Sequence, residues 1–336
     1  MRWGDARPTL LCLPSPMNSI DALYAGFVST LPEALLPLAR SLPHTLGLAP
    51  TEQATWSDVF SHPVTLEAPH LFAAAFPGAG PEQVRSAVLA HALSVIEAFG
   101  TDRIADGQVR ATTELTSLLV ELRRGRDAIL EDLSPGLGDV ARAADRETNE
   151  AILEENALLR RLGAATFEEY RRISLAKQAV GFPASVALAR SAGATEVEQE
   201  LVRRTLAGVW LGLQFEDDAT DWEDDWRRGG GAWAVSLARR RLESVSDQPA
   251  DERPTEPDLV RRRVHRMRVL HSMLRGARHQ YRTAWRYARV LGAVPILRWA
   301  EQRMKHLDVV IPLEGRHAGY VVRAMKLAPW AREILT

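Results

Sequence analysis

The chain has 336 residues, of which 46% are apolar and 25% charged, a composition typical of a water-soluble globular protein. The formal net charge of −1 gives no electrostatic reason to expect nucleic acid or an anionic membrane as partner. The single cysteine, Cys12, excludes an intrachain disulfide, and no run reaches the roughly 18 apolar residues that a membrane span needs.

Helical periodicity dominates the sequence in chain order. Apolar residues recur at spacings of three and four, whereas alternating β-branched runs are scarce. This pattern predicts helices over Glu82–Phe99, Thr112–Leu133, Arg146–Leu162, Phe167–Ser191, Glu196–Trp226, Asp258–Leu291, Val294–Val310 and His317–Ile334. Residues 1–60 carry the weakest pattern, and 246–257 is predicted to be an exposed loop. We therefore expect one all-α domain over residues 1–336, located in the cytoplasm because its N-terminus lacks the apolar core of a signal peptide.

The first candidate site residues are Asp102 and Asp106, near the end of an apolar helix. Aspartates four residues apart point the same way on a helix. A diphosphate held by several magnesium ions needs carboxylates from two opposing helices. An exposed pair with Arg103 as a local ion partner is the alternative.

Lys177 is the second candidate. It lies in a run of apolar and small residues, between Ala176 and Ala179. A buried lysine is unfavourable unless it is paired, and a diphosphate would supply the partner. The alternative is a lysine whose amine reaches solvent along its own apolar stem.

The third candidate is the acidic segment that follows the apolar helix Leu206–Leu211. One narrow stripe of this helix carries Gln214, Asp218, Asp221 and Asp225, with Asp217 beside it. Stacked carboxylates repel one another, and the helix dipole disfavours anions near a helix C-terminus. A magnesium ion removes this conflict, because it prefers carboxylate oxygens and shares them with substrate phosphates. A solvated acidic face is the alternative.

Together these segments resemble the central part of the class I isoprenoid synthases. Lys177-Gln178-Ala179 is followed about thirty-five residues later by a glutamine-bearing helix that enters Asp217-Asp218-Ala219-Thr220-Asp221, a complete DDxxD motif. The resemblance covers roughly residues 85–240. It implies an all-α bundle with a central active-site cavity, carboxylates on two facing helices, and three Mg²⁺ ions on the diphosphate of a prenyl substrate.

The resemblance also implies roles for individual residues. Metal binding falls to Asp102, Asp106, Asp217, Asp218, Asp221 and Asp225, and diphosphate binding to Lys177, Gln214, Arg227 and Arg228. Phe99, Phe182, Trp210 and Phe215 lie near the motifs and are candidates for stabilising an allylic cation, although core packing is the commoner role of such residues. A homodimer is left open, and neither nucleic acid nor stable membrane insertion is expected.

Departures from the family pattern bear on the reaction. The first motif is DxxxD (Asp102 to Asp106), and Arg123-Arg124-Gly125 lies too far downstream of Asp106 to be the Arg-Arg-Gly feature of the chain-elongating synthases. No lysine precedes Lys177 to hold a second diphosphate. We therefore expect ionisation of one prenyl diphosphate followed by cyclisation or rearrangement, as in an atypical terpene synthase. The alternatives are a prenyltransferase, either a polyprenyl diphosphate synthase or a squalene/phytoene synthase-like enzyme, a non-catalytic helical partner subunit, and a non-isoprenoid magnesium hydrolase.

Overall fold

The computed structural model describes residues 19–60, 62–160, 165–229, 232–244 and 257–324. These residues form sixteen α-helices, three short 3₁₀ helices and no β-strand, so the predicted all-α class is confirmed. Among them, no helix combines the length and the apolarity needed to cross a bilayer.

Short helices make up the N-terminal part, where the sequence pattern was weakest. They are α1 (Ile20–Val28), η2 (Glu33–Leu35), α2 (Leu36–Arg40), α3 (Leu42–Thr45), α4 (Trp56–Val59), α5 (Pro63–Phe72) and η3 (Ala73–Ala75). A proline is the first or second residue of α2, α3 and α5, where its missing N–H would have no partner in any case. Trp56 is buried edge-to-face on Tyr24, with 5.8 Å between ring centroids, and ties α4 to α1.

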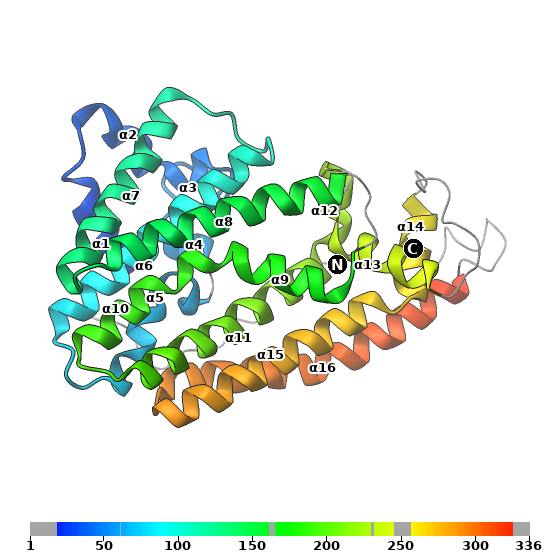
Figure 1. Cartoon of the computed structure of the whole chain (residues 1–336). Coiled ribbons are helices and arrows are strands. Elements are labelled where there is room, and N and C mark those ends of the chain that lie inside the picture. The colour runs from blue at the N-terminus through cyan, green and yellow to red at the C-terminus, as the bar shows by residue number, and fades with distance from the viewer. Residues whose placement is uncertain (1–18, 61, 161–164, 230–231, 245–256, 325–336) are drawn as a thin grey trace.

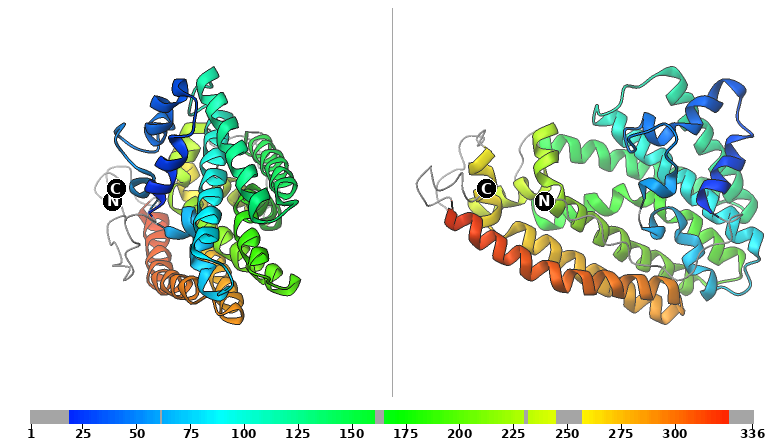
Figure 2. Two further views of the ribbon diagram at one scale, coloured as in Figure 1. Left: turned by 90° about the vertical axis from the view of Figure 1, so that its left-hand side faces the viewer. Right: turned by 180° about the vertical axis from the view of Figure 1, so that it is seen from behind.

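Longer helices build the bundle that carries the site (Figure 1). They are α6 (Pro81–Ala105), α7 (Thr113–Leu133), α8 (Leu137–Arg160), α9 (Phe167–Lys177), η4 (Ala179–Gly181), α10 (Pro183–Ser191) and α11 (Glu196–Thr220). The C-terminal helices are α12 (Trp222–Gly229), α13 (Trp233–Glu243), α14 (Pro257–Arg266), α15 (Val269–Leu291) and α16 (Val294–Ala324). Helices α15 and α16 form a long antiparallel pair along one side of the bundle, as the view from behind also shows (Figure 2).

Close packing of α11 on α15 fixes the position of the acidic segment. A Cβ at Gly208 would lie 2.8 Å from the backbone oxygen of Gln280 and 2.9 Å from the backbone nitrogen of Ala284. Glycine therefore allows the two helix backbones to approach each other directly. Further along, Phe215 of α11 packs on Gly276 of α15, so the two helices run antiparallel.

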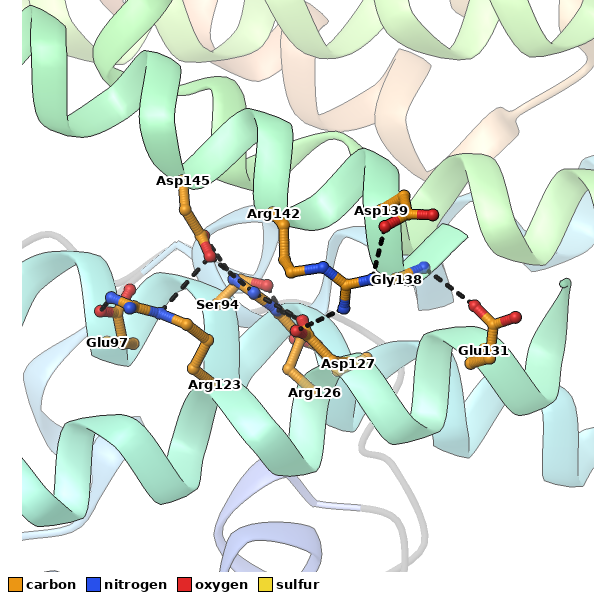
Figure 3. A network of polar contacts seen from close by, with 11 residues as sticks. Ser94, Glu97, Arg123, Arg126, Asp127, Glu131, Gly138, Asp139, Arg142 and Asp145 are labelled. Carbon is orange, nitrogen blue, oxygen red and sulfur yellow. Dashed lines mark hydrogen bonds and ion pairs between the residues drawn. The ribbon is translucent and has the colours of Figure 1, made fainter. Parts of the chain in front are cut away.

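A buried ionic network holds α6, α7 and α8 together (Figure 3). The Arg126 side chain is 1% exposed and binds Asp145 with both of its terminal nitrogens, at 2.5 and 2.7 Å. Its Nη2 also donates to Asp127 at 2.6 Å. Arg123 pairs with the buried Glu97 of α6 and lies 3.4 Å from Asp145. Each buried charge therefore has an opposite partner, which is the condition under which buried charge is tolerated.

Several predicted helix boundaries were wrong. The helix expected over Phe167–Ser191 is interrupted before Pro183, since proline lacks an N–H and disfavours helical backbone in the residue before it. The helix expected over Glu196–Trp226 ends at Asp221, where φ is −102° and ψ is 3°. Aspartate favours such ends because its short side chain competes for backbone hydrogen bonds.

The C-terminal boundaries differ too. The helix expected over Asp258–Leu291 breaks at Arg268, which adopts a left-handed conformation with φ of 53° that no sequence signal indicates. The helices predicted on either side of Pro312 are continuous in α16, with Pro312 inside. The loop predicted over 246–257 lies almost wholly outside the described residues, as does the end of the helix predicted over His317–Ile334.

Candidate functional site

The acidic end of α11 carries the most buried aspartate of the predicted site. Asp218 is held by two donors: Tyr170 O–H donates to Oδ2, and Gln214 Nε2 donates to Oδ1 at 2.9 Å. Gln178 Nε2 in turn donates to Gln214 Oε1 at 3.2 Å. A carboxylate with fixed donors on both oxygens has little freedom to rotate, so α9 sets the orientation of Asp218.

Lys177 is the last residue of α9, so the residue at which this helix begins determines where Lys177 is placed. Thr166 and Glu169 form a capping box, with the Glu169 backbone N–H donating to Thr166 Oγ1 at 3.1 Å. The side chain of Lys177 is only 16% exposed. Its ammonium binds the Glu155 carboxylate and lies 3.6 Å from Asp102 Oδ1. Lys177 is therefore largely buried, and its partners among the described residues are carboxylates of α6 and α8, whereas the expected partner was a diphosphate.

The first acidic pair sits at the end of α6, where the two aspartates differ in surroundings. Asp102 is half-buried and faces Lys177, and its Oδ1 has no hydrogen-bond donor among the described residues. Asp106 is the C-cap of α6 and is exposed, with Asn156 of α8 donating to it at 3.0 Å. Asp102 therefore faces the lysine, and Asp106 lies at the rim.

Glu155 is a site residue that the sequence analysis missed. Its side chain is 12% exposed, and it accepts a hydrogen bond from Trp233 Nε1 at 2.6 Å in addition to binding Lys177. A signal existed, because Glu155 continues the buried stripe of α8 formed by Thr148, Ala151 and Ile152. A glutamate on the apolar stripe of a helix needs a partner of opposite charge.

The pKa values of three site carboxyl groups, Asp102, Asp217 and Asp218, are raised, which favours their protonated forms. Burial raises the pKa of Asp218, and the neighbouring Asp217 raises it further, while the hydrogen bond from Tyr170 opposes both. Burial is also the largest cause raising the pKa of Asp102, against the attraction of Lys177. Although Asp217 reaches solvent, loss of hydration together with Asp221 and Asp225 raises its pKa to about 6. Because loss of hydration is the largest cause of each shift, these are poorly hydrated carboxylates, and a nearby cation would favour their charged forms.

The pKa of Lys177 is set by a different balance, in which neighbouring charges outweigh burial. Burial alone would lower the pKa of Lys177, but Glu155 and Asp102 outweigh that effect and raise its pKa above the ordinary value. Lys177 is therefore a permanently charged group at neutral pH, available to an anionic ligand that can compete with Glu155.

The other side of α11 is anchored through Glu216, the residue before the DDxxD motif. Tyr281 O–H of α15 donates to Glu216 at 2.9 Å, and Arg303 of α16 forms an ion pair with it. His306 lies 3.6 Å away. The acidic segment is thus fastened to the α15/α16 pair on one face and presents Asp217 and Asp218 on the other.

The remaining predicted residues lie on or beside α12. Asp221 is exposed at the junction of α11 and α12, and Asp225 is half-buried on α12. Arg227 is exposed and paired with Glu223 at 3.0 Å and Asp224 at 3.4 Å. Arg228 is in α12, but its side chain lies outside the described residues. The structure therefore places Lys177 against Asp102 and Gln214 against Asp218, with Asp218 acting on Lys177 through its charge, whereas Arg227 has local partners of its own.

The candidate aromatic residues are divided between the site and the core. Phe215 is fully buried and stacks on Tyr170, with centroids 4.9 Å apart. The ring of Trp210 stacks on that of His91 with centroids 5.9 Å apart, and the ring of Phe99 packs on that of Phe60 with centroids 5.1 Å apart. Phe182 is partly buried against the same core as Phe215. The ring centroids of Tyr170 and Trp233 are 4.6 Å apart. This aromatic contact lies next to Glu155 and was not predicted from the sequence.

The chemistry of the donors fits magnesium only if the substrate contributes ligands. Among the described residues, no three His, Cys, Asp or Glu side chains stand close enough to hold a metal ion by themselves. Magnesium commonly binds through one or two carboxylates and completes its shell with water and substrate phosphates. The orphaned Oδ1 of Asp102 and the raised pKa of Asp217 agree with carboxylates that gain a cation together with an anionic substrate.

Sequence comparison finds no matching family model and no matching curated protein. Structural comparison finds similar chains. A polyprenyl synthetase from Streptomyces coelicolor A3(2) matches with a TM-score of 0.62 at 17% identity, over 84% of this chain and 97% of that one. A geranylgeranyl pyrophosphate synthetase from the archaeon Geoglobus acetivorans matches with a TM-score of 0.62 at 16% identity. The match covers 86% of this chain and 99% of that one.

A polyprenyl synthase from Caulobacter crescentus CB15, complexed with calcium and isoprenyl diphosphate, matches with a TM-score of 0.58 at 17% identity, over 87% of this chain and 99% of that one. At such identities the likeness concerns the fold, and it extends over nearly the whole of each compared structure. The chain has the all-α fold of the class I isoprenoid synthases.

Proposed function

We propose that the chain is a magnesium-dependent enzyme that ionises an allylic prenyl diphosphate and transfers the prenyl group to a second substrate. The observation that carries the proposal is the position of Lys177, which contacts Glu155 of α8 and Asp102 of α6 and lies in the field of Asp218 of α11. A cation between carboxylates from opposed helices is suited to a diphosphate bound together with divalent metal ions. The similar structures are prenyl synthases, which supports prenyl transfer over the cyclisation that the sequence favoured.

In this proposal Asp102, Asp217 and Asp218 hold the metal ions, with Asp106, Asp221 and Asp225 nearer the rim. Bound magnesium would draw charge from the diphosphate leaving group and so weaken its bond to the prenyl carbon.

The residues of the chain have their own tasks. Lys177 binds the diphosphate once the anion displaces Glu155, and Gln214 keeps Asp218 oriented. The stacked rings of Tyr170 and Phe215, with Trp233, offer apolar and π-rich surface that excludes water and stabilises an allylic cation.

Cyclisation of a single substrate is the second candidate, and a specific observation favours it. The chain has no lysine before Lys177, so it lacks an N-terminal lysine to hold a second diphosphate. A non-catalytic partner subunit is the weaker alternative, because it would not need both acidic helices to converge on one lysine. A homodimer and a cytoplasmic location stay predictions.

Incubation with geranyl, farnesyl and geranylgeranyl diphosphates tests the proposal, each with and without isopentenyl diphosphate and with Mg²⁺ or a chelator. Prenyl transfer predicts a longer diphosphate that appears only when both substrates and Mg²⁺ are present. A hydrocarbon or alcohol formed from one substrate alone would show that the enzyme cyclises or rearranges its substrate and does not transfer a prenyl group. The absence of Mg²⁺-dependent turnover with any substrate would refute both reactions.

The variant D218N/D221N ties the reaction to the site. We expect it to lower Mg²⁺-dependent diphosphate release at least roughly 100-fold, because two metal-binding charges are removed while side-chain shape is kept. Its helical circular dichroism should match that of R124Q, a control at an exposed arginine paired with Glu121. Unchanged turnover in D218N/D221N would contradict the assignment of the metal site.

A further inference from the structure

Helix α15 carries positive charge that nothing on the same helix compensates. Its 23 residues include no aspartate or glutamate and five arginines: Arg275, Arg278, Arg282, Arg286 and Arg289. The whole chain has a net charge of −1, so this helix departs sharply from the average. The net charge that argued against an anionic partner therefore hides an uneven distribution.

Five cationic or titratable residues of α15 form one outward stripe. Arg275, His279, Arg282, Arg286 and Arg289 follow one another at alternating spacings of four and three, and all five are exposed. On a helix these positions fall within an arc of about 80° and extend over about 21 Å. The opposite face of α15 is buried in the core through residues such as Ala277, Tyr281, Ala284 and Ala288. We call these five residues the basic stripe.

The charge of the basic stripe is not neutralised by neighbours. In the described part of the chain, no carboxylate lies within ion-pair distance of Arg275, Arg282 or Arg286. The carboxylates that flank α15 are already paired: Asp308 with Arg278 at 2.6 Å, Glu301 with Lys305 at 2.8 Å, and Glu200 with Arg204 at 2.8 Å.

Some exposed arginines elsewhere in this protein have ion-pair partners. Arg124 pairs with Glu121 at 2.7 Å, Arg142 with Asp139 at 2.6 Å, and Arg172 with Glu154. Others, such as Arg110, Arg146 and Arg171, have no ion pair among the described residues either. The distinguishing feature of α15 is therefore that its unpaired arginines follow one another along a single helix face, where they can meet an external anion together.

The surroundings of the stripe indicate which anion. At the end where α15 meets α16, Val290 is 72% exposed and Val294 is 44% exposed. Near the other end, a hollow of about 380 Å³ lies between α15 and α16, with His271, Arg275, Arg278 and Asp308 in its wall. A straight basic row beside exposed valines suits a surface that offers phosphate groups above an apolar layer.

We propose that the basic stripe docks the protein on the anionic headgroups of a lipid bilayer. Its arginines lie along the headgroup phosphates, Val290 and Val294 contact the acyl boundary, and no helix crosses the membrane. Duplex nucleic acid is the less suitable partner, because its phosphates leave the exposed valines without an apolar contact. The docking surface is on α15, away from Asp102 and Lys177, and it does not depend on which reaction the site performs.

Co-sedimentation with vesicles tests the proposal on the full chain at low salt. We expect binding to phosphatidylcholine vesicles that contain phosphatidylserine, none to phosphatidylcholine alone, and release by salt, since surface charge interactions are screened. R275Q/R282Q/R286Q should weaken the binding by on the order of 100-fold, because each basic residue near the surface contributes roughly a fivefold factor. R124Q/R142Q/R172Q removes the same charge from paired arginines and should bind within about twofold of wild type.

Three results would contradict the proposal that the basic stripe docks on a bilayer. They are no binding of the wild-type chain to phosphatidylserine vesicles, equal binding to neutral vesicles, or equal losses in the two triple variants with matching circular dichroism. Binding to duplex DNA in place of the vesicles, lost in R275Q/R282Q/R286Q, would reassign the stripe to nucleic acid. V290S/V294S, which keeps every charge, should also weaken vesicle binding but leave any DNA binding unchanged.

Discussion

Lys177 meets carboxylates from several helices, and only part of that arrangement could be read from the sequence. Its apolar surroundings predicted a buried, paired amine, and Asp102 and Asp218 were expected nearby. The nearest partner, Glu155, was missed because an acidic residue in a helix is usually solvated, and its burial depends on how α8 packs against α9 and α13. The pairing explains how a lysine that is 16% exposed remains charged before any diphosphate binds.

Removal of Glu155 tests this pairing. E155L leaves Lys177 with Asp102 alone at 3.6 Å, and breaking a buried ion pair on one side destabilises a protein by about 3 kcal/mol. E155L/K177M should lose less than E155L does, since no uncompensated charge remains. Urea unfolding of the four proteins in this double-mutant cycle measures the coupling. Additive losses would show that the two side chains do not stabilise each other.

The titration of Asp217 gives a second test at the residue scale. Its pKa is raised to about 6 from 3.8, so the protonated form contributes stability that is lost as pH rises through that range. D217N stays neutral and should therefore unfold at higher urea than wild type at about pH 8 without metal, with the difference vanishing near pH 4. The same variant should lose activity. If wild type were as stable as D217N at the higher pH, the ionised Asp217 would not destabilise the fold, and its raised pKa would be contradicted.

At the scale of elements, helix type was predictable and several helix ends were not. Apolar spacing of three and four identified α6, α7, α8, α11, α15 and α16. Helices α7, α8, α15 and α16 each bury one face, whereas α6 is buried on every side from Ala90 to Glu97. The break at Asp221 and the left-handed Arg268 depend on tertiary contacts that no local pattern encodes. The helix predicted over Val294–Val310 stopped short of Pro312, yet α16 continues through that proline, packed against α15.

Two glycines inside helices should respond in opposite ways to alanine. At Gly208 the new methyl group would meet the backbone of α15, so G208A should destabilise the chain by about 2 kcal/mol through overpacking. Gly26 of α1 has nothing within 4 Å of its Cβ position, so G26A should stabilise by about 0.5 kcal/mol through helix propensity. Thermal unfolding distinguishes them. Equal effects would contradict the close approach of α11 and α15.

At the scale of the whole molecule, the acidic helices are useful only because the bundle brings them together. Asp102 and Asp218 are more than one hundred residues apart in sequence, and the network around Arg126 with the α11/α15 packing holds α6 and α11 in place. The sequence indicated this convergence through the likeness of its motifs to a known fold. It could not indicate whether one or two substrates bind, and a single domain over residues 1–336 stays a prediction.

The most direct test of the account is calorimetric binding of inorganic diphosphate, with and without Mg²⁺. We expect wild type to bind diphosphate only with Mg²⁺, and D102N/D106N and D218N/D221N each to lose this binding, because carboxylates from both helices hold the metal–diphosphate complex. The bound complex should also raise the unfolding temperature of wild type alone, by mass action. Metal-independent binding, or full binding after the loss of either acidic pair, would contradict a shared diphosphate site between α6 and α11.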